Sequence, residues 1–291
     1  MEWTAELALD ARADLGEGPL WDAAGSRLVW VDIMAGRVNA FAPATGRTQS
    51  WAAGEPVGAA ALRASGGLLL ALQSGFAALD EATGALTKLA GYEGATHEVR
   101  MNDGKCDPAG RFWAGTMAFD QRPGAGALYR LDPSGAVATV LTGVGISNGL
   151  DWAPGGQGMY YVDSPTARID LFDYDAATGA ISGRRPFVRI EEGAGWPDGL
   201  TVDAAGNVWV ALWGGSAVRC YSPAGKLEGV VRVPALQSSS CAFGGEDLGD
   251  LYITSARTGL AEDVLAQNPA SGGVFVVRTG ARGRAAWKYS G

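Results

Sequence analysis

The chain has 291 residues and a formal net charge of −8 at pH 7, which disfavours nucleic acid and anionic membrane surfaces as partners. Residues 1–6 carry two glutamates and lack the apolar core that is typical of a signal peptide. Apolar runs such as residues 68–72 are far too short to span a bilayer. Three widely spaced cysteines, Cys106, Cys220 and Cys241, do not suggest a disulfide framework. We therefore expect a cytoplasmic protein with no nucleic-acid or membrane partner.

One unit recurs six times along the chain: a short apolar strand pattern, a turn often of the form D-x-x-G, and a second apolar or aromatic strand pattern. The second patterns, 40 to 48 residues apart, are Val29-Trp30-Val31, Leu69-Leu70-Ala71, Phe112-Trp113-Ala114, Tyr160-Tyr161-Val162, Val208-Trp209-Val210 and Leu251-Tyr252-Ile253. The 44 glycines and 13 prolines suit many short strands joined by tight turns. A period of this length predicts an all-β fold, a six-bladed β-propeller with four-stranded antiparallel blades, as a single domain over residues 1–291.

The two ends of the chain are expected to close the ring. We predict that residues 4–9 pair with residues 273–278 in the last blade, which would remove exposed sheet edges. Outside the strands, only residues 259–267 show a weak helical pattern, so we expect one or two helical turns there.

One position, five residues before the start of each turn, recurs in all six units. It is occupied by Glu17, Gly58, Asn102, Asn148, Asp198 and Ser238. Each of these alone would be an ordinary turn residue, but equivalent positions become neighbours when repeats close into a ring. Buried carboxylates that face one another are costly without a cation, and carboxylate and amide oxygens suit a hard divalent ion. We therefore predict a metal site formed by Glu17, Asn148, Asp198 and water. Asn102 would reach the ion directly or through water and substrate.

Arg100 lies two residues before Asn102, so an extended strand places both side chains on one face. We expect Arg100 to face the channel, where its guanidinium suits an oxygen-rich ligand. The sequence leaves open an alternative, in which Arg100 forms an ion pair with a neighbouring channel carboxylate such as Asp103.

The single histidine, His97, excludes several kinds of site. Zinc sites with several imidazoles and histidine-dyad hydrolases are impossible, and a Ser-His-Asp triad lacks its G-x-S-x-G elbow. No glycine-rich phosphate loop opens a helix, so nucleotide chemistry has no support. We expect His97 to be a loop residue at the rim of the channel.

Several motifs together resemble the regucalcin (senescence marker protein)/gluconolactonase family of six-bladed propellers, over residues 13–275. The stretch 211–215, with later pieces around residues 260 and 266, is more similar to the bacterial sugar-acid lactonase branch than to animal members. The matching motifs are Leu15-Gly16-Glu17-Gly18-Pro19, Arg100-Met101-Asn102-Asp103-Gly104-Lys105, Gly115-Thr116-Met117, Ser147-Asn148-Gly149 and Pro197-Asp198-Gly199.

The resemblance implies hydrolysis of an aldonolactone, of the gluconolactone, xylonolactone or arabinonolactone type, with one divalent metal. Ca²⁺ or Zn²⁺ would be expected, with Mn²⁺ or Fe²⁺ as other candidates. Glu17, Asn148 and Asp198 would be the metal ligands, and Asp198 would also be the general base. Arg100 and Asn102 would contact the substrate, and the family's acidic substrate contact after Gly-Thr-Met is assigned to Asp120.

The metal would polarise the lactone carbonyl or acidify a bound water, and Asp198 would take a proton from the attacking water. Two alternatives remain open: an ester or phosphotriester hydrolase that uses the same site, and a non-catalytic calcium-binding propeller. Scaffold propellers bind partners through exposed rims and need no buried ring of carboxylates and amides, so the ring favours chemistry. We expect a small sugar lactone as the partner and a monomer or weak homodimer as the assembly.

Overall fold

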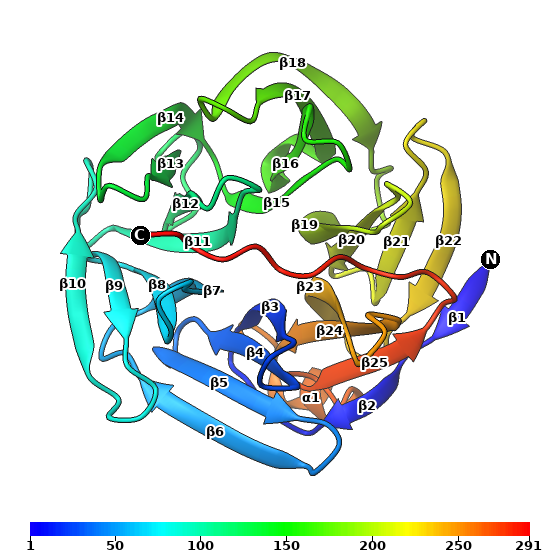
Figure 1. Cartoon of the computed structure of the whole chain (residues 1–291). Helices are drawn as coiled ribbons and strands as arrows, with labels where there is room; N and C mark the ends of the chain where they lie inside the picture. Colours follow the sequence, from blue (N-terminus) through cyan, green and yellow to red (C-terminus); the bar gives the residue numbers. More distant parts are fainter.

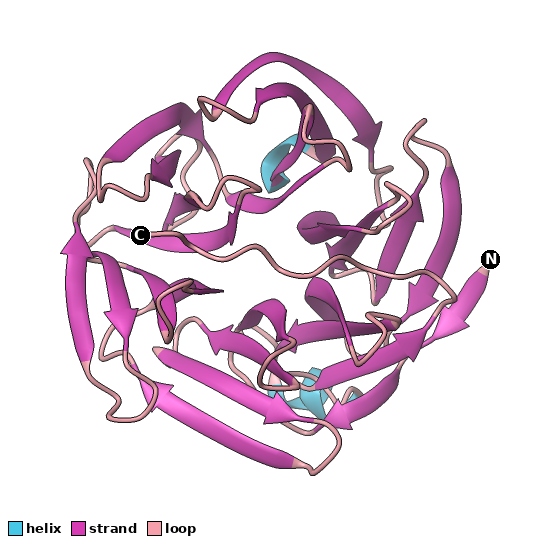
Figure 2. Ribbon diagram, in the orientation of Figure 1, coloured by secondary structure: helices cyan, strands magenta, loops and turns pink.

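The computed structural model describes all 291 residues, whose strands form six sheets arranged around a central axis (Figure 1). The predicted six-bladed β-propeller is therefore confirmed. Figure 2 shows how little helix accompanies the strands: only α1 (Glu262–Gln267), inside the region predicted to be helical, and the 3₁₀ turn η1 (Ser164–Thr166). Neither helix is long and apolar enough to cross a membrane.

Each blade runs from an inner strand at the channel to an outer strand at the rim, with antiparallel neighbours. Blades 1 and 2 contain β3 (Gly16–Asp22), β4 (Arg27–Asp32), β5 (Arg37–Ala42), β6 (Arg47–Ala52), β7 (Val57–Leu62), β8 (Leu68–Leu72), β9 (Gly75–Leu79) and β10 (Leu86–Ala90). Blades 3 and 4 contain β11 (Val99–Cys106), β12 (Phe112–Ala118), β13 (Gly126–Leu131), β14 (Val137–Val144), β15 (Ser147–Trp152), β16 (Gly158–Asp163), β17 (Arg168–Asp175) and β18 (Ala180–Arg189). Blades 5 and 6 contain β19 (Trp196–Val202), β20 (Val208–Trp213), β21 (Ala217–Tyr221), β22 (Leu227–Arg232), β23 (Gln237–Gly244), β24 (Asp250–Ala256) and β25 (Val274–Arg278).

The recurring D-x-x-G turn has a structural explanation. The carboxylate of Asp107 accepts a hydrogen bond from the backbone N–H of Ala109 (2.9 Å) and, through its other oxygen, from the indole N–H of Trp113 (2.9 Å). Asp203 accepts from the indole of Trp209 in the same way (3.0 Å). The aspartate thus holds the turn and satisfies the polar atom of a tryptophan that is otherwise buried between blades.

The N-terminus closes the ring as predicted for residues 6–9, whereas Thr4, also predicted in the last blade, lies in blade 5. Strand β2 (Glu6–Leu9) pairs with β25 in an antiparallel ladder that places Glu6 opposite Val276, so both ends of the chain build blade 6. The structure adds a feature that was not predicted. Strand β1 (Glu2–Thr4) runs parallel to β22 and becomes a fifth strand of blade 5.

Residues 279–291, here called the C-terminal strap, cross one face of the propeller, and appear in red in Figure 1. The backbone carbonyl of Arg282 accepts from Ala204 N–H in blade 5 (2.8 Å), and Tyr289 N–H donates to the carbonyl of Leu62 in blade 2 (2.8 Å). The strap therefore ties together blades that lie across the channel from one another.

Every inner strand is irregular at the recurring position. The pairing register shifts at or directly after this position in β3, β7, β11, β15, β19 and β23. Such β-bulges re-aim a side chain and end regular pairing. In this protein four of the six equivalent positions, Glu17, Asn102, Asn148 and Asp198, line one cavity at one end of the channel.

Candidate functional site

The channel holds a cavity of about 560 Å³ at the end where the inner strands begin. A volume of this size is ordinary for a small-molecule site. Five of the predicted residues line it: Glu17 of blade 1, Arg100 and Asn102 of blade 3, Asn148 of blade 4, and Asp198 of blade 5. All five are nearly buried, with exposed fractions of 4–6%. Glu17 and Asp198, 181 positions apart in the sequence, thus meet at the bottom of one cavity.

The other two recurring positions do not contribute a side chain to the cavity. At Gly58, an added Cβ would lie 2.4 Å from the backbone of Met101, so the absence of a side chain lets blades 2 and 3 approach. Gly149, beside Asn148, likewise allows blades 4 and 5 to approach, because an added Cβ at this residue would lie 2.6 Å from the carbonyl oxygen of Asp198. Ser238 is fully buried outside the cavity.

A directional chain of hydrogen bonds crosses the floor of the cavity. Arg100 Nη1 donates to Asn102 Oδ1 (2.6 Å), and Asn102 Nδ2 donates to Asn148 Oδ1 (2.9 Å). Asn148 Nδ2 donates to Ser164 Oγ (2.8 Å), whose hydroxyl donates in turn to the carbonyl of Pro197 (2.7 Å). A guanidinium can only donate and a carbonyl can only accept, so the two ends fix the direction of every bond between them. The network therefore determines the orientation of both carboxamides.

The carboxylates of the site are poorly compensated. Burial, followed by the nearby charge of Asp103, raises the pKa of Glu17 to about 8. Burial is also the main cause that raises the pKa of Asp198 well above its usual value, with the charge of Glu17 second. Oδ1 of Asp198 is buried without any hydrogen-bond partner. An unpaired buried carboxylate oxygen is costly, so this site is suited to a cation.

Arg100 does not form the ion pair with Asp103 that the sequence left open. Its Nη1 donates to the carbonyl of Met101 (3.1 Å) and to Asn102, while Nε and Nη2 have no protein acceptor. Burial lowers the pKa of Arg100 to about 10 despite the attraction of Glu17 and Asp198, so the side chain remains a cation at neutral pH. Its free N–H groups are available to a ligand in the cavity.

The side-chain oxygens of Glu17, Asn148 and Asp198 are suitable ligands for a hard divalent metal ion. No cluster of three or more His, Cys, Asp or Glu side chains has ligand spacing in this structure, so a cation here would depend on two carboxylates and a carboxamide. Glu17, Asn148 and Asp198 offer oxygen atoms only, and Asp198 Oδ1 has no other partner. Oxygen donors with water completing the shell are typical of Ca²⁺ and related ions.

Asp120, which the resemblance assigns as a substrate contact, does not line the cavity in this structure. Asp120 Oδ2 accepts from Arg122 Nη1 (2.9 Å) on the exposed side of the loop, and the lining residues from this loop are Phe119 and Gln121. Gln121, whose φ of 57° lies in the left-handed region, lines the cavity together with Phe119, whereas Asp120 between them does not. His97 is exposed and does not line the cavity.

Ser164 is a member of the floor that the sequence did not reveal. It begins η1, directly after β16, and is therefore outside the recurring position that marked the other residues. The available signal was local: Asp163-Ser164-Pro165 follows an apolar strand, and proline favours the first turn of a helix.

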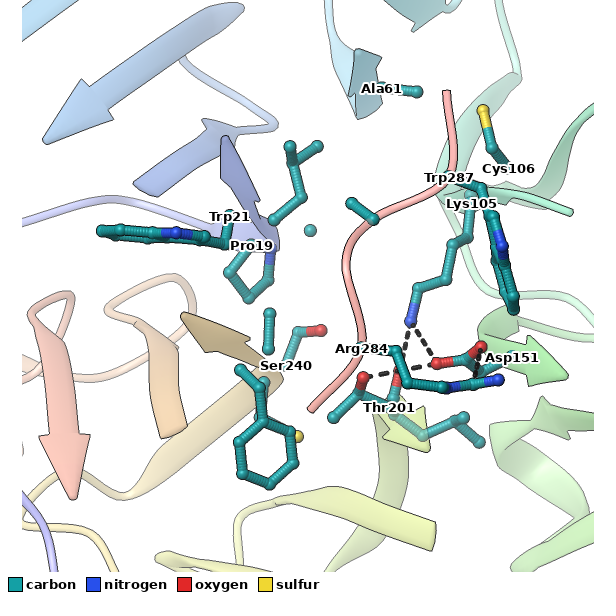
Figure 3. Close-up of a pocket in the computed structure, with 18 of the residues that line it drawn as sticks. Pro19, Trp21, Ala61, Lys105, Cys106, Asp151, Thr201, Ser240, Arg284 and Trp287 are labelled. Carbon is teal, nitrogen blue, oxygen red and sulfur yellow. Dashed lines mark hydrogen bonds and ion pairs between the residues drawn. The ribbon is translucent and has the colours of Figure 1, made fainter. Parts of the chain in front are cut away.

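A second, smaller cavity of about 80 Å³ lies at the opposite end of the channel (Figure 3). Lys105 Nζ donates to Asp151 (3.2 Å) and to the carbonyl of Leu200 (2.8 Å), and Arg284 of the strap donates to Asp151 (3.1 Å). The strap covers this end with residues that include Trp287. Because both cations are engaged and the strap closes this mouth, a ligand would reach the channel from the wider cavity.

The fold and the oxygen-rich cavity on its axis define a β-propeller with a small-molecule site. The profile of the SMP-30/Gluconolactonase/LRE-like region matches residues 15–257, and the chain belongs to this family. Regucalcin of Xenopus laevis is 38% identical over 293 residues, covering 98% of both chains. The putative sugar lactone lactonase YvrE of Bacillus subtilis is 39% identical over 272 residues, covering 93% of both chains. The crystal structure of a calcium-binding protein, regucalcin, from Agrobacterium tumefaciens superposes with a TM-score of 0.94 at 31% identity, covering 99% of this chain and 98% of that one.

Proposed function

We propose that this protein is a metal-dependent lactonase that hydrolyses an aldonolactone, of the gluconolactone, xylonolactone or arabinonolactone type, to its sugar acid. The observation that carries the proposal is the convergence of Glu17, Asn148 and Asp198 with Arg100 and Asn102 in one cavity. Family membership and the similarity to a protein named as a putative sugar lactone lactonase support it.

Glu17, Asn148 and Asp198 would hold one divalent cation, Ca²⁺ or Zn²⁺, with Mn²⁺ or Fe²⁺ as further candidates. When bound there, such a cation supplies Lewis-acid polarisation of the lactone carbonyl and makes a bound water more acidic. The buried oxygen of Asp198 that lacks a partner supports this ligand set.

The side chains of the site would carry the proton transfers and the positioning. Asp198 accepts a proton from the attacking water, whose oxygen forms a bond to the acyl carbon. Arg100 donates hydrogen bonds through its free N–H groups to the oxygen that becomes negative, and Asn102 Oδ1 uses its second lone pair to accept from a substrate hydroxyl. The ring C–O bond then breaks, and Asp198 returns the proton to the leaving alkoxide.

Acid release from a panel of aldonolactones, with and without a chelator, tests the proposal. We expect chelator-sensitive hydrolysis, and Asn102→Ala should raise KM when it is assayed at saturating metal, because Asn102 also orients Asn148 and its loss should weaken metal affinity. Aryl esters and phosphotriesters in the same panel test the alternative hydrolase. Metal binding without acid release from any substrate would instead support a non-catalytic calcium-binding propeller.

We also propose a cytoplasmic protein that acts as a monomer or weak homodimer on a small-molecule lactone. The three cysteines are free and buried, which suits a reducing compartment. Sedimentation over a range of concentrations would test the assembly, and cell fractionation would test the location.

A further inference from the structure

The mouth of the larger cavity is apolar although its floor is polar. Met34, Phe119 and Trp196 line the cavity and remain 42%, 39% and 52% exposed. They come from blades 1, 3 and 5, and Trp196 is paired across the ladder with Trp213, which also lines the cavity. We call these four residues the apolar collar.

Charged groups are excluded from the collar. The three charged residues that line the cavity, Glu17, Arg100 and Asp198, are all nearly buried at its floor. Beside Phe119, the loop does carry charges, but Arg122 pairs with Asp120 (2.9 Å) and Glu98 (2.7 Å) outside the cavity. The same loop therefore presents an aromatic ring to the cavity and its charges to solvent.

The apolar collar brings exposed aromatic and aliphatic side chains from separate blades to one cavity, which indicates that they bind a ligand. Water-exposed apolar side chains are common singly, but several that line the rim of one concave site indicate a binding surface. Few polar side chains accompany the collar, chiefly Gln121 and Thr258. A substrate hydroxyl held against the collar would lose water and find few partners, whereas a methyl or alkyl group would gain burial.

We propose that the apolar collar selects lactones whose end remote from the carbonyl carries an apolar substituent. The methyl group of a deoxy-sugar lactone, or a longer alkyl group in its place, is preferred over the hydroxymethyl group of an ordinary hexonolactone. This inference rests on the proposed function for its orientation, because the reacting carbonyl has to face the polar floor. The remote end of the ring then points to the mouth.

The test uses δ-lactones with identical ring hydroxyls that differ only in the exocyclic group: hydroxymethyl, methyl or ethyl. We expect kcat/KM about tenfold higher for methyl than for hydroxymethyl, and a further gain of about fourfold for the added methylene of ethyl. Trp196→Ala and Phe119→Ala should bring the ratio of methyl to hydroxymethyl close to one. Leu227→Ala is the matched control, because Leu227 is an exposed hydrophobic residue (44%) on strand β22 that does not line the cavity. It should leave the ratio unchanged.

A binding measurement separates this inference from the proposed function. The δ-lactams of the same series resist hydrolysis, so their affinities can be measured by calorimetry whether or not the protein is a lactonase. If the methyl lactam binds more tightly than the hydroxymethyl lactam, and this difference is lost in Trp196→Ala, the proposed selectivity of the apolar collar is supported. Equal or weaker binding of the methyl compound, or a parental ratio in both collar variants, overturns it. Hydrolysis of no lactone, together with a clear preference among lactams, would overturn only the proposed function.

Discussion

Replacing Ser164 with alanine tests whether the hydrogen-bond network holds Asn148 as a metal ligand. The hydroxyl of Ser164 accepts from Asn148 Nδ2 (2.8 Å) and donates to the carbonyl of Pro197 (2.7 Å). Since its one proton is committed to Pro197, the oxygen can only accept from Asn148, which keeps Oδ1 of the carboxamide on the side of Asn102. Ser164→Ala removes one of the two bonds that set this orientation.

The loss of stability in Ser164→Ala follows from two polar atoms that lose their hydrogen-bond partner, Asn148 Nδ2 and the carbonyl oxygen of Pro197. Leaving a buried polar group unsatisfied costs about 1–3 kcal/mol, and the cavity beside Ser164 allows water to replace the hydroxyl. We therefore expect a loss of about 1 kcal/mol in the free energy of unfolding. The affinity for the divalent cation should fall about tenfold, which is typical when a residue that orients a ligand is removed.

Calorimetric titration of the metal-free protein with Ca²⁺ or Zn²⁺ measures this affinity. Thr166→Ala is the matched control, because Thr166 lies in the same 3₁₀ turn and donates to the carbonyl of Asp163 (2.7 Å) without touching Asn148. A second control uses Asn148→Asp, whose two carboxylate oxygens are equivalent and need no orientation. In that background Ser164→Ala should change affinity little. Parental affinity in Ser164→Ala, or an equal loss in Thr166→Ala, would refute the reasoning.

Four further predictions concern the metal, the base, pH and the strap. Glu17→Gln keeps the shape of the side chain but removes a charge, so metal affinity should fall about tenfold or more and the Tm should no longer depend on added metal; unchanged titration would contradict the ligand assignment. Asp198→Asn should retain part of the metal content while kcat falls roughly 10²–10⁴-fold in acid-release assays; near-parental kcat with full metal would exclude Asp198 as the base. Burial raises the pKa of Glu17 from 4.5 to about 8 in the folded, metal-free protein. The protonated Glu17 side chain therefore contributes its full stability below pH 4.5, and this contribution is lost as the pH rises through 8. As the pH rises from 4.5 to 8, the Tm of the protein in chelator should therefore fall, and the increase in Tm on adding metal should become larger. An increase in Tm that does not change with pH would contradict this prediction. Deleting residues 280–291 removes the bond from Arg284 to Asp151 and the packing of Trp287 on Trp152, and should lower the Tm by at least ~5 °C in a thermal melt; an unchanged Tm would show that the strap is dispensable.

The repeat made much of the fold and several candidate site residues accessible from the sequence. A shared register placed Glu17, Asn102, Asn148 and Asp198 in equivalent strands, and ring closure then brought their side chains to one cavity. Arg100 followed from strand alternation alone. The β-bulges that aim these side chains were not predictable, because a bulge depends on the pairing of two strands and leaves no periodic trace in either one.

Features outside the repeat were missed for the same reason. Ser164 reaches the floor from a connection, and its role depends on the carbonyl of Pro197 in the next blade. The strap has no strand or helix periodicity, so its path across the channel is set by contacts such as Arg284 with Asp151. Asp120 could not be placed from the sequence because residue order in a loop does not determine which side chains face a cavity; its neighbours Phe119 and Gln121 line the cavity instead.

The burial of the site has opposite consequences for its acids and for its single arginine. Arg100 stays charged at neutral pH because its pKa is lowered only to about 10, whereas the pKa values of Glu17, Asp103 and Asp198 are all raised, chiefly by burial. Arg100 lowers the pKa of Glu17 and Asp198, and Lys105 lowers that of Asp103, but burial outweighs both cations, so the metal-free site favours protonated acids. A protonated Asp198 cannot accept a proton from water. Binding a divalent cation displaces such protons, so in the proposed function the event that fills the site also prepares its base.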